Sequence, residues 1–147
     1  MRAQDLQIGD TVYVRSRRAI EEAHLHVLIT PPEGHPPTAI VVHVTSFDSD
    51  ICEDPTLILQ AGDHPFIVHP SYVWYAQAGR IALEPLVQAI EEGYAELRER
   101  CASVLLRRIR EGFLKSDEPT RRLKRELVGV LQAEAAARDA AKKPEIT

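Results

Sequence analysis

Two short stretches decide the fold: residues 24–29 read His-Leu-His-Val-Leu-Ile, and residues 40–45 read Ile-Val-Val-His-Val-Thr. Successive side chains of a β-strand point to opposite faces, so every second residue shares a face. In the first stretch, apolar side chains at alternate positions oppose His24 and His26. In the second, they oppose His43 and Thr45. Both stretches therefore predict β-strands that turn one apolar face toward a core.

Further short apolar runs lie on both sides of these two strands, with turn-forming residues between them. A Gly9-Asp10 turn precedes the run 11–14, and a proline-rich loop covers residues 31–37. Other runs occupy residues 56–59, 66–68 and 72–75. Five or six short strands separated by turns are typical of a small barrel or sandwich. We expect an antiparallel β-barrel over residues 1–80.

The pattern changes after Gly79, where apolar residues begin to recur at helical spacing. The apolar positions predict helices within residues 83–90, 105–113 and 123–131. The chain is therefore expected to be an α+β protein, in which five to six short strands are followed by two or three amphipathic helices. Residues 81–147 form this helical extension, and the tail is expected to fray from about residue 135.

The composition indicates a cytoplasmic globular protein. Its two cysteines form no disulfide framework, and the sequence contains neither a signal peptide nor an uncharged stretch of about 18 residues that could span a membrane. The formal net charge of −4 is unevenly spread. Residues 1–97 carry a net charge of −9, whereas residues 98–125 carry +6. This cationic stretch either attracts phosphates or an acidic protein, or faces the acidic half of its own chain.

Strand parity gathers one set of candidate catalytic residues. If both central strands turn their apolar faces inward, the side chains of His24, His26, His43 and Thr45 lie together on the outer face. Histidine titrates near neutral pH, so imidazoles beside a hydroxyl are suited to general acid–base catalysis. The alternative is an ordinary solvated sheet face that happens to carry histidines.

A second set of polar residues lies in residues 62–72, which contain His64, His69 and Ser71. A bend at one of the prolines in this segment would bring the two histidines together. Alternatively, the segment is a turn whose histidines satisfy backbone groups. The histidines of the chain lack the ordered spacing of a zinc finger or an HExxH helix, so we expect no metal and no other cofactor.

The layout of the β half resembles the MazF/PemK group of toxins, small SH3-like barrels that cleave RNA. The resemblance rests on Gly9–Val14, on His26–Thr30 and on the segment from Ala39 to Ser46. It implies metal-independent transphosphorylation, in which an arginine near the first strand–strand loop and a hydroxyl residue after the third strand take part. Arg15, Arg17 or Arg18 and Thr45 or Ser46 occupy those places here.

Three hypotheses follow. The first is a MazF/PemK-like endoribonuclease of a toxin–antitoxin type system, whose partners would be RNA, an antitoxin-like protein and a second copy. The second is a non-catalytic interaction module on the same barrel, whose helices dock a partner or form a homodimer. The third is nucleic-acid binding by the cationic stretch 98–125. The first hypothesis assigns catalysis to His24, His26, Thr45 and Arg17, and binding to Arg15, Arg18, His43, Ser46, His64, His69 and Ser71.

Overall fold

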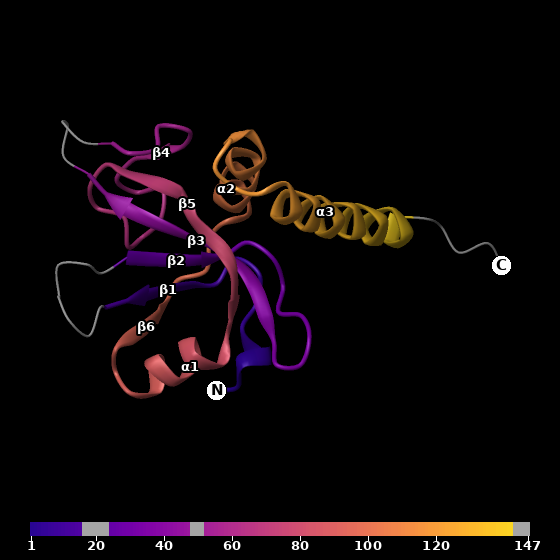
Figure 1. The fold of residues 1–147 in the computed structure, drawn as a ribbon, viewed down its shortest axis with the longest axis horizontal. Helices are drawn as coiled ribbons and strands as arrows, with labels where there is room; N and C mark the ends of the chain where they lie inside the picture. The colour runs from indigo at the N-terminus through magenta and orange to yellow at the C-terminus, as the bar shows by residue number, and fades with distance from the viewer. Residues whose placement is uncertain (16–23, 48–51, 143–147) are drawn as a thin grey trace.

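A computed structural model of the chain describes residues 1–15, 24–47 and 52–142, which form an α+β fold with one six-stranded antiparallel sheet and three α-helices (Figure 1). The strand order is β4-β5-β3-β2-β1-β6. The edge strands β4 and β6 do not pair with each other in the described residues, and the sheet curls into a half-barrel. The strands are β1 (Thr11–Val14), β2 (His24–Leu28), β3 (Thr38–Ser46), β4 (Ile58–Leu59), β5 (Ser71–Ala82) and β6 (Ala95–Arg98).

The helices lie on both sides of this sheet. A short 3-10 turn, η1 (Ala3–Asp5), precedes the first strand, and α1 (Glu84–Glu91) separates β5 from β6. The chain ends with α2 (Ser103–Lys115) and α3 (Arg121–Lys142). Figure 1 shows α2 at one end of the sheet, α1 at the other, and α3 extending away from the body. No helix in the described part of the chain is both long and apolar enough to cross a membrane.

Antiparallel pairing of β2 with β3 places Leu25 opposite Val44 and His26 opposite His43. The apolar residues of these strands therefore share one face, as the alternating pattern predicts. They form the larger hydrophobic core with residues of α2 and α3, including Ile109, Phe113 and Leu127, all of which are fully buried.

The opposite face of the sheet is not simply solvated. At the end nearer α1 it carries a second core, in which Val12, Leu28 and Val41 pack against Leu83 and Leu86. The histidines occupy the other end of this same face. The sheet therefore has a hydrophobic core on each face, and the end of the second face away from α1 is left for polar side chains.

Tyr75 joins β5 to α2. Its side chain is fully buried, its hydroxyl donates a hydrogen bond to the Ile109 carbonyl oxygen (2.8 Å), and its ring packs edge-on against Phe113. Its backbone N–H donates to the buried carboxylate of Asp54 (3.2 Å). Gly112 lies directly under the ring, where a Cβ atom would overlap the Tyr75 hydroxyl oxygen and approach Cζ to 2.9 Å. The absence of a side chain at Gly112 therefore allows α2 to pack on β5.

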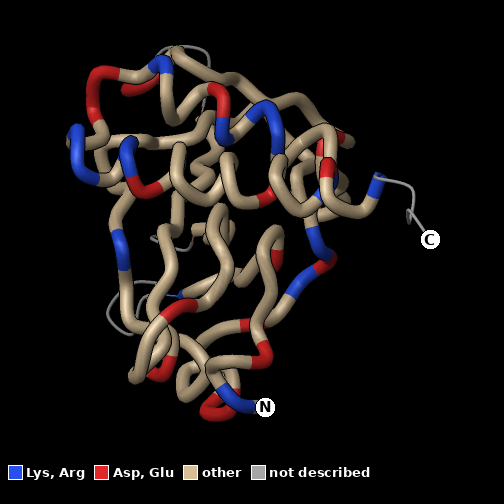
Figure 2. The backbone as a smooth tube through the Cα atoms, turned by 90° about the vertical axis from the view of Figure 1, so that its right-hand side faces the viewer, with Lys and Arg blue, Asp and Glu red and all other residues tan. Residues whose placement is uncertain are grey.

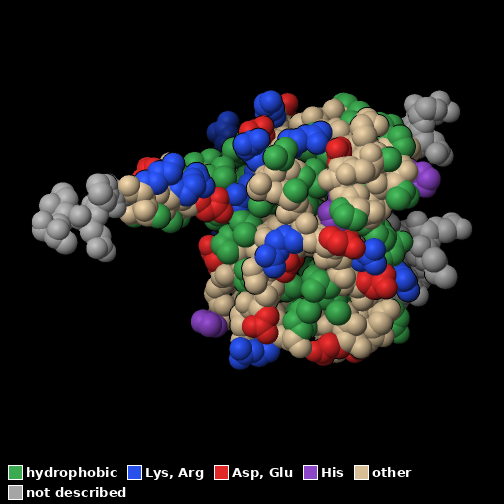
Figure 3. Space-filling view, turned by 180° about the vertical axis from the view of Figure 1, so that it is seen from behind, with side chains coloured by type: hydrophobic (Ala, Val, Ile, Leu, Met, Phe, Trp, Pro, Cys, Tyr) green, Lys and Arg blue, Asp and Glu red, His purple; other side chains and the backbone are tan. Residues whose placement is uncertain are grey.

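A buried arginine fastens α3 to the rest of the molecule. Arg110, only 7% exposed, donates from Nε to the Ile29 carbonyl oxygen (2.9 Å) and from both terminal nitrogens to the Glu134 carboxylate (2.8 and 2.9 Å). The planar guanidinium suits this two-point geometry. The C-terminal part of α3 projects from the body (Figure 3).

The structure differs from the expectations in three elements. β6 pairs with β1, although it lies within the range predicted to be helical. The prediction missed this strand because Ala95-Glu96-Leu97-Arg98 is too short and too charged to show a strand pattern. Residues 66–68 form no strand: the segment is a turn in which the Gly62 N–H donates a hydrogen bond to the Ile67 carbonyl oxygen (3.0 Å). Helix α3 continues to Lys142, past the predicted start of fraying at residue 135.

The cationic stretch is partly neutralised by acidic residues of the same chain. Arg100 pairs with Asp10 (2.9 Å), and Arg108 pairs with Asp63 (3.5 Å). Figure 2 shows Lys and Arg gathered around α2 and α3, whereas Asp and Glu predominate near the N-terminus. Ion pairing with acidic residues of the same chain, one of the two alternatives that the sequence left open, therefore neutralises part of the positive charge of residues 98–125.

The two helical glycines Gly112 and Gly129 provide a matched test of this packing. We expect Gly112→Ala to lower the free energy of unfolding by roughly 1–3 kcal/mol, because the added methyl group overpacks against Tyr75. A Cβ atom added at Gly129 would meet no atom within 4 Å, so Gly129→Ala should raise stability by up to about 1 kcal/mol through helix propensity. Chemical denaturation measures both, and equal effects of the two substitutions would contradict the packing described here.

Candidate functional site

Three imidazoles and a hydroxyl lie together on the sheet face opposite the larger core. Thr45 Oγ1 is 3.1 Å from Nδ1 of His24, within hydrogen-bonding distance. The rings of His26 and His43, which are paired across β2 and β3, have centroids 4.0 Å apart. The His24 and His43 rings are stacked with centroids 6.1 Å apart. We call these four residues the histidine–threonine cluster, and all of its members are half-buried.

Two of the three imidazoles, His26 and His43, are held in the neutral form by burial. Burial, reinforced by the neighbouring His26 and His24 rings, lowers the pKa of His43 to about 4. Burial also lowers the pKa of His26, although a hydrogen bond to the His24 carbonyl oxygen partly opposes this shift. In that bond Nδ1 of His26 donates to the oxygen at 3.1 Å, so Nε2 of the neutral ring carries the lone pair. His26 is therefore suited to accept a proton at neutral pH.

Aromatic side chains extend the same face beyond the histidines. In the pairing of β3 with β5, Thr45 lies opposite Tyr72 and His43 lies opposite Trp74. The Tyr72 and Trp74 rings are in edge contact, with centroids 6.2 Å apart. The sequence identified Tyr72 and Trp74 only as part of a strand. The strand order that brings β5 beside β3 is what adds them to the site.

Ser46, His69 and Ser71 lie on the other side of the sheet from the cluster. Ser46 and Ser71 are paired across β3 and β5, on the face that holds the larger core. Together with His69 they line a hollow of about 390 Å³. Thr45 and Ser46 thus point to opposite sides of the sheet, although the resemblance allows either of them as the hydroxyl residue that takes part in cleavage.

His64 has a structural role. Its ring is 2% exposed, its Nδ1 accepts a hydrogen bond from the Phe66 N–H (3.0 Å), and its Nε2 contacts the Glu99 carbonyl oxygen at 2.5 Å. Both ring nitrogens are therefore occupied by the backbone. These contacts fit the alternative of a turn histidine that satisfies backbone groups, and they leave no ring nitrogen free for the binding role predicted for His64.

Of the three arginines predicted to take part, only Arg15 lies within the described residues. The Arg15 guanidinium forms an ion pair with Glu96 (3.4 Å) and lies 5.9 Å from the centroid of the Tyr13 ring. Val14, not Arg15, is paired with His24, so Arg15 follows the opposite face of β1. Arg17 and Arg18 fall outside the described residues.

Other chemistries find little support in the described residues. They contain no group of three or more His, Cys, Asp or Glu side chains arranged to hold a metal ion. Burial raises the pKa of the Cys101 thiol to about 12, so Cys101 is no thiolate at neutral pH.

Comparison with known proteins returns no match to a family model, to a curated protein or to a solved structure.

The lowered pKa of His43 makes stability depend on pH. Because His43 titrates near 4 in the folded state and near 6.5 when unfolded, its contribution is complete above pH 6.5 and is lost as the pH falls toward 4. We expect His43→Gln to weaken this pH dependence by on the order of 1 kcal/mol, after allowance for the partial exposure of the ring. Urea denaturation at a series of pH values measures the effect.

The matched control for this experiment is Trp74→Phe, which alters the strand partner of His43 without removing a titrating group. It should change stability but retain its dependence on pH. An unchanged acid response in the His43 variant would show that the ring is not held neutral by its neighbours.

Proposed function

We propose that this chain is a MazF/PemK-like protein of a toxin–antitoxin type system, with an SH3-like barrel that cleaves RNA without a metal. The observation that carries the proposal is the hydrogen-bonding contact of 3.1 Å between His24 Nδ1 and Thr45 Oγ1, beside the paired rings of His26 and His43. Thr45 is the penultimate residue of β3, close to the position at which the resemblance expects a hydroxyl residue. In this proposal the protein acts on cytoplasmic RNA.

The chemistry proposed is attack of a ribose 2′-oxygen on the adjacent phosphorus. His26 Nε2 takes the proton of the 2′-hydroxyl as the new P–O bond forms, and its neutral state suits it to this role. His24 enters the step as an imidazolium and gives a proton to the 5′-oxygen as the bond between phosphorus and that oxygen breaks, and its contact with Thr45 fixes the orientation of the ring. The products are a 2′,3′-cyclic phosphate and a 5′-hydroxyl. By its place in the sequence, Arg17 would neutralise the phosphate charge.

Two features of the face support RNA as the substrate. The half-buried Trp74 lies next to the cluster, opposite His43, and aromatic rings are the usual stacking partners of unpaired bases, whereas Tyr72 is buried beside it. The cluster lies at the end of the sheet where β1 ends and β2 begins, and in the sequence Arg17 and Arg18 come between these two strands. An antitoxin-like protein would then act by covering this end.

Cleavage of a mixed RNA in the presence of EDTA tests the proposal. We expect His24→Ala and His26→Ala each to lower the rate by about 10²–10⁴-fold, the usual contribution of a general acid or base. His35→Ala serves as the matched control, because this exposed histidine lies in the loop between β2 and β3, outside the cluster. Absence of cleavage, or equal rates for all three variants, would refute the proposed activity.

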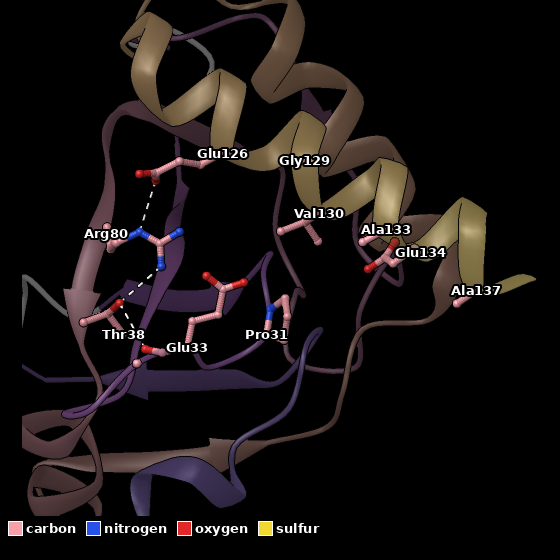
Figure 4. A pocket seen from close by; sticks show the side chains of 11 residues that line it. Pro31, Glu33, Thr38, Arg80, Glu126, Gly129, Val130, Ala133, Glu134 and Ala137 are labelled. Carbon is pink, nitrogen blue, oxygen red and sulfur yellow. Dashed lines mark hydrogen bonds and ion pairs between the residues drawn. The ribbon is translucent and has the colours of Figure 1, made fainter.

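A second candidate function, a non-catalytic module that forms a homodimer, is favoured by a groove along α3. Its volume is about 750 Å³, and it runs between α3 and the segment from Pro31 to Thr38. Figure 4 shows Arg80 and Glu33 on the sheet side of the groove and Val130 and Ala133 on the helix side. Glu126 already binds Arg80 (3.1 Å), whereas no described residue binds the Glu33 carboxylate.

The occupant proposed for this groove is α3 of a second copy, whose basic first turns would approach Glu33. The apolar residues Leu105, Ile109, Phe113 and Leu127 of the helices cannot serve as an interface, because they are buried in the larger core. Sedimentation should then detect a dimer that Ala133→Arg disrupts and that Ala136→Arg, outside the groove lining, leaves intact. A monomer at every concentration would exclude this function.

A further inference from the structure

The hollow on the core side of the sheet has the composition of a binding site for a planar ring. It measures about 390 Å³ and opens beside the ends of β3 and β5. Its walls include the half-exposed rings of Tyr13 and Phe66, and its rim includes Val68, which is 66% exposed. Pockets of this size, lined by aromatic and apolar groups with a few polar atoms, are typical of small-ligand sites.

Polar groups are available at the edge of a ring bound there. Ser46 and His69 line the hollow, and no described residue forms a hydrogen bond with the Ser46 hydroxyl or with the His69 ring. Ser71 is 4% exposed, and its hydroxyl donates to the His69 carbonyl oxygen (2.9 Å), which leaves its oxygen lone pairs as acceptors. The hollow therefore offers both donors and acceptors next to an aromatic wall.

Two arginines flank the aromatic wall. The Tyr13 and Phe66 rings have centroids 4.6 Å apart, and the Arg98 guanidinium carbon lies 4.8 Å from the Phe66 ring centroid. The Arg15 guanidinium carbon lies 5.9 Å from the Tyr13 ring centroid. Glu96 and Glu99 pair with these arginines only at 3.4 and 3.7 Å, and both guanidinium groups remain partly exposed. A phosphate attached to the bound ring would find cations next to the site.

The hollow also lies close to the histidine–threonine cluster. Thr45 and Ser46 are consecutive residues of β3, and they point to opposite faces at the same end of the sheet. A nucleotide chain that passes over this end would place a phosphate beside Thr45 and a neighbouring base beside Ser46.

We propose that the hollow lined by Tyr13, Phe66, Ser46, His69 and Ser71 binds a nucleobase of the substrate RNA. This inference rests on the proposed ribonuclease function, which it deepens by assigning a second contact to the RNA. The ring stacks on Phe66 or Tyr13, its polar edge meets the two serine hydroxyls and His69, and its phosphate faces Arg15 and Arg98.

Binding of adenosine 5′-monophosphate to the full-length protein tests this subsite without any cleavage step. In an NMR titration we expect the ring signals of Tyr13 and Phe66 to shift with nucleotide concentration. Ribose 5-phosphate, which lacks the base, should leave them in place. Ser46→Leu fills the mouth of the hollow and should weaken nucleotide binding roughly tenfold or more, in line with the contribution of a stacked base.

Two further variants keep the test decisive. Phe66→Leu removes the stacking surface and should weaken binding as Ser46→Leu does, whereas Phe47→Leu, which alters an aromatic residue outside the lining, should not. Equal shifts from ribose 5-phosphate, no shift from the nucleotide, or unchanged affinity in Ser46→Leu would overturn the inference. If the protein binds the nucleotide but cleaves no RNA, the proposed activity is refuted and the subsite stands. If it cleaves RNA but does not bind the nucleotide, only the subsite is refuted.

Discussion

The register between β2 and β3 is the constraint on which the site and both cores depend. It pairs Leu25 with Val44 and His26 with His43. Since the side-chain period of a strand is two, a slip of one residue would turn the apolar residues out and the imidazoles into the larger core. Burial of the apolar set therefore fixes the position of the histidines, and the energy of the hydrophobic core holds the cluster together.

The remaining elements explain why the histidines meet only at one end of the sheet. The face they share is covered at its other end by α1 and by the second core around Val12 and Leu28. On the reverse face, Tyr75 and Arg110 fix α2 and α3 over the larger core. What remains uncovered is the sheet end near Thr45 and Ser46, with the imidazoles on one side and the aromatic hollow on the other.

Alternation of apolar and polar residues was enough to predict β1, β2, β3 and the shared face of His24, His26 and His43, because these signals are local. β6 escaped prediction because a short charged strand is stabilised by its neighbour β1 and not by its own pattern. The place of Tyr72 and Trp74 beside the cluster depends on strand order, which a local pattern does not contain. The contact of His64 with the Glu99 carbonyl oxygen could not be predicted for a related reason, since Glu99 lies far away in the sequence. The SH3-like barrel and the MazF/PemK relationship remain proposals.

The chemical ends of cleaved RNA test the proposed mechanism most directly, because they report whether the ribose 2′-oxygen was the nucleophile. A defined RNA oligonucleotide would be incubated with the protein in EDTA and its fragments analysed by mass spectrometry. We predict a 2′,3′-cyclic phosphate on the upstream fragment and a 5′-hydroxyl on the downstream one. Fragments with a 3′-hydroxyl and a 5′-phosphate, or intact RNA, would contradict this mechanism.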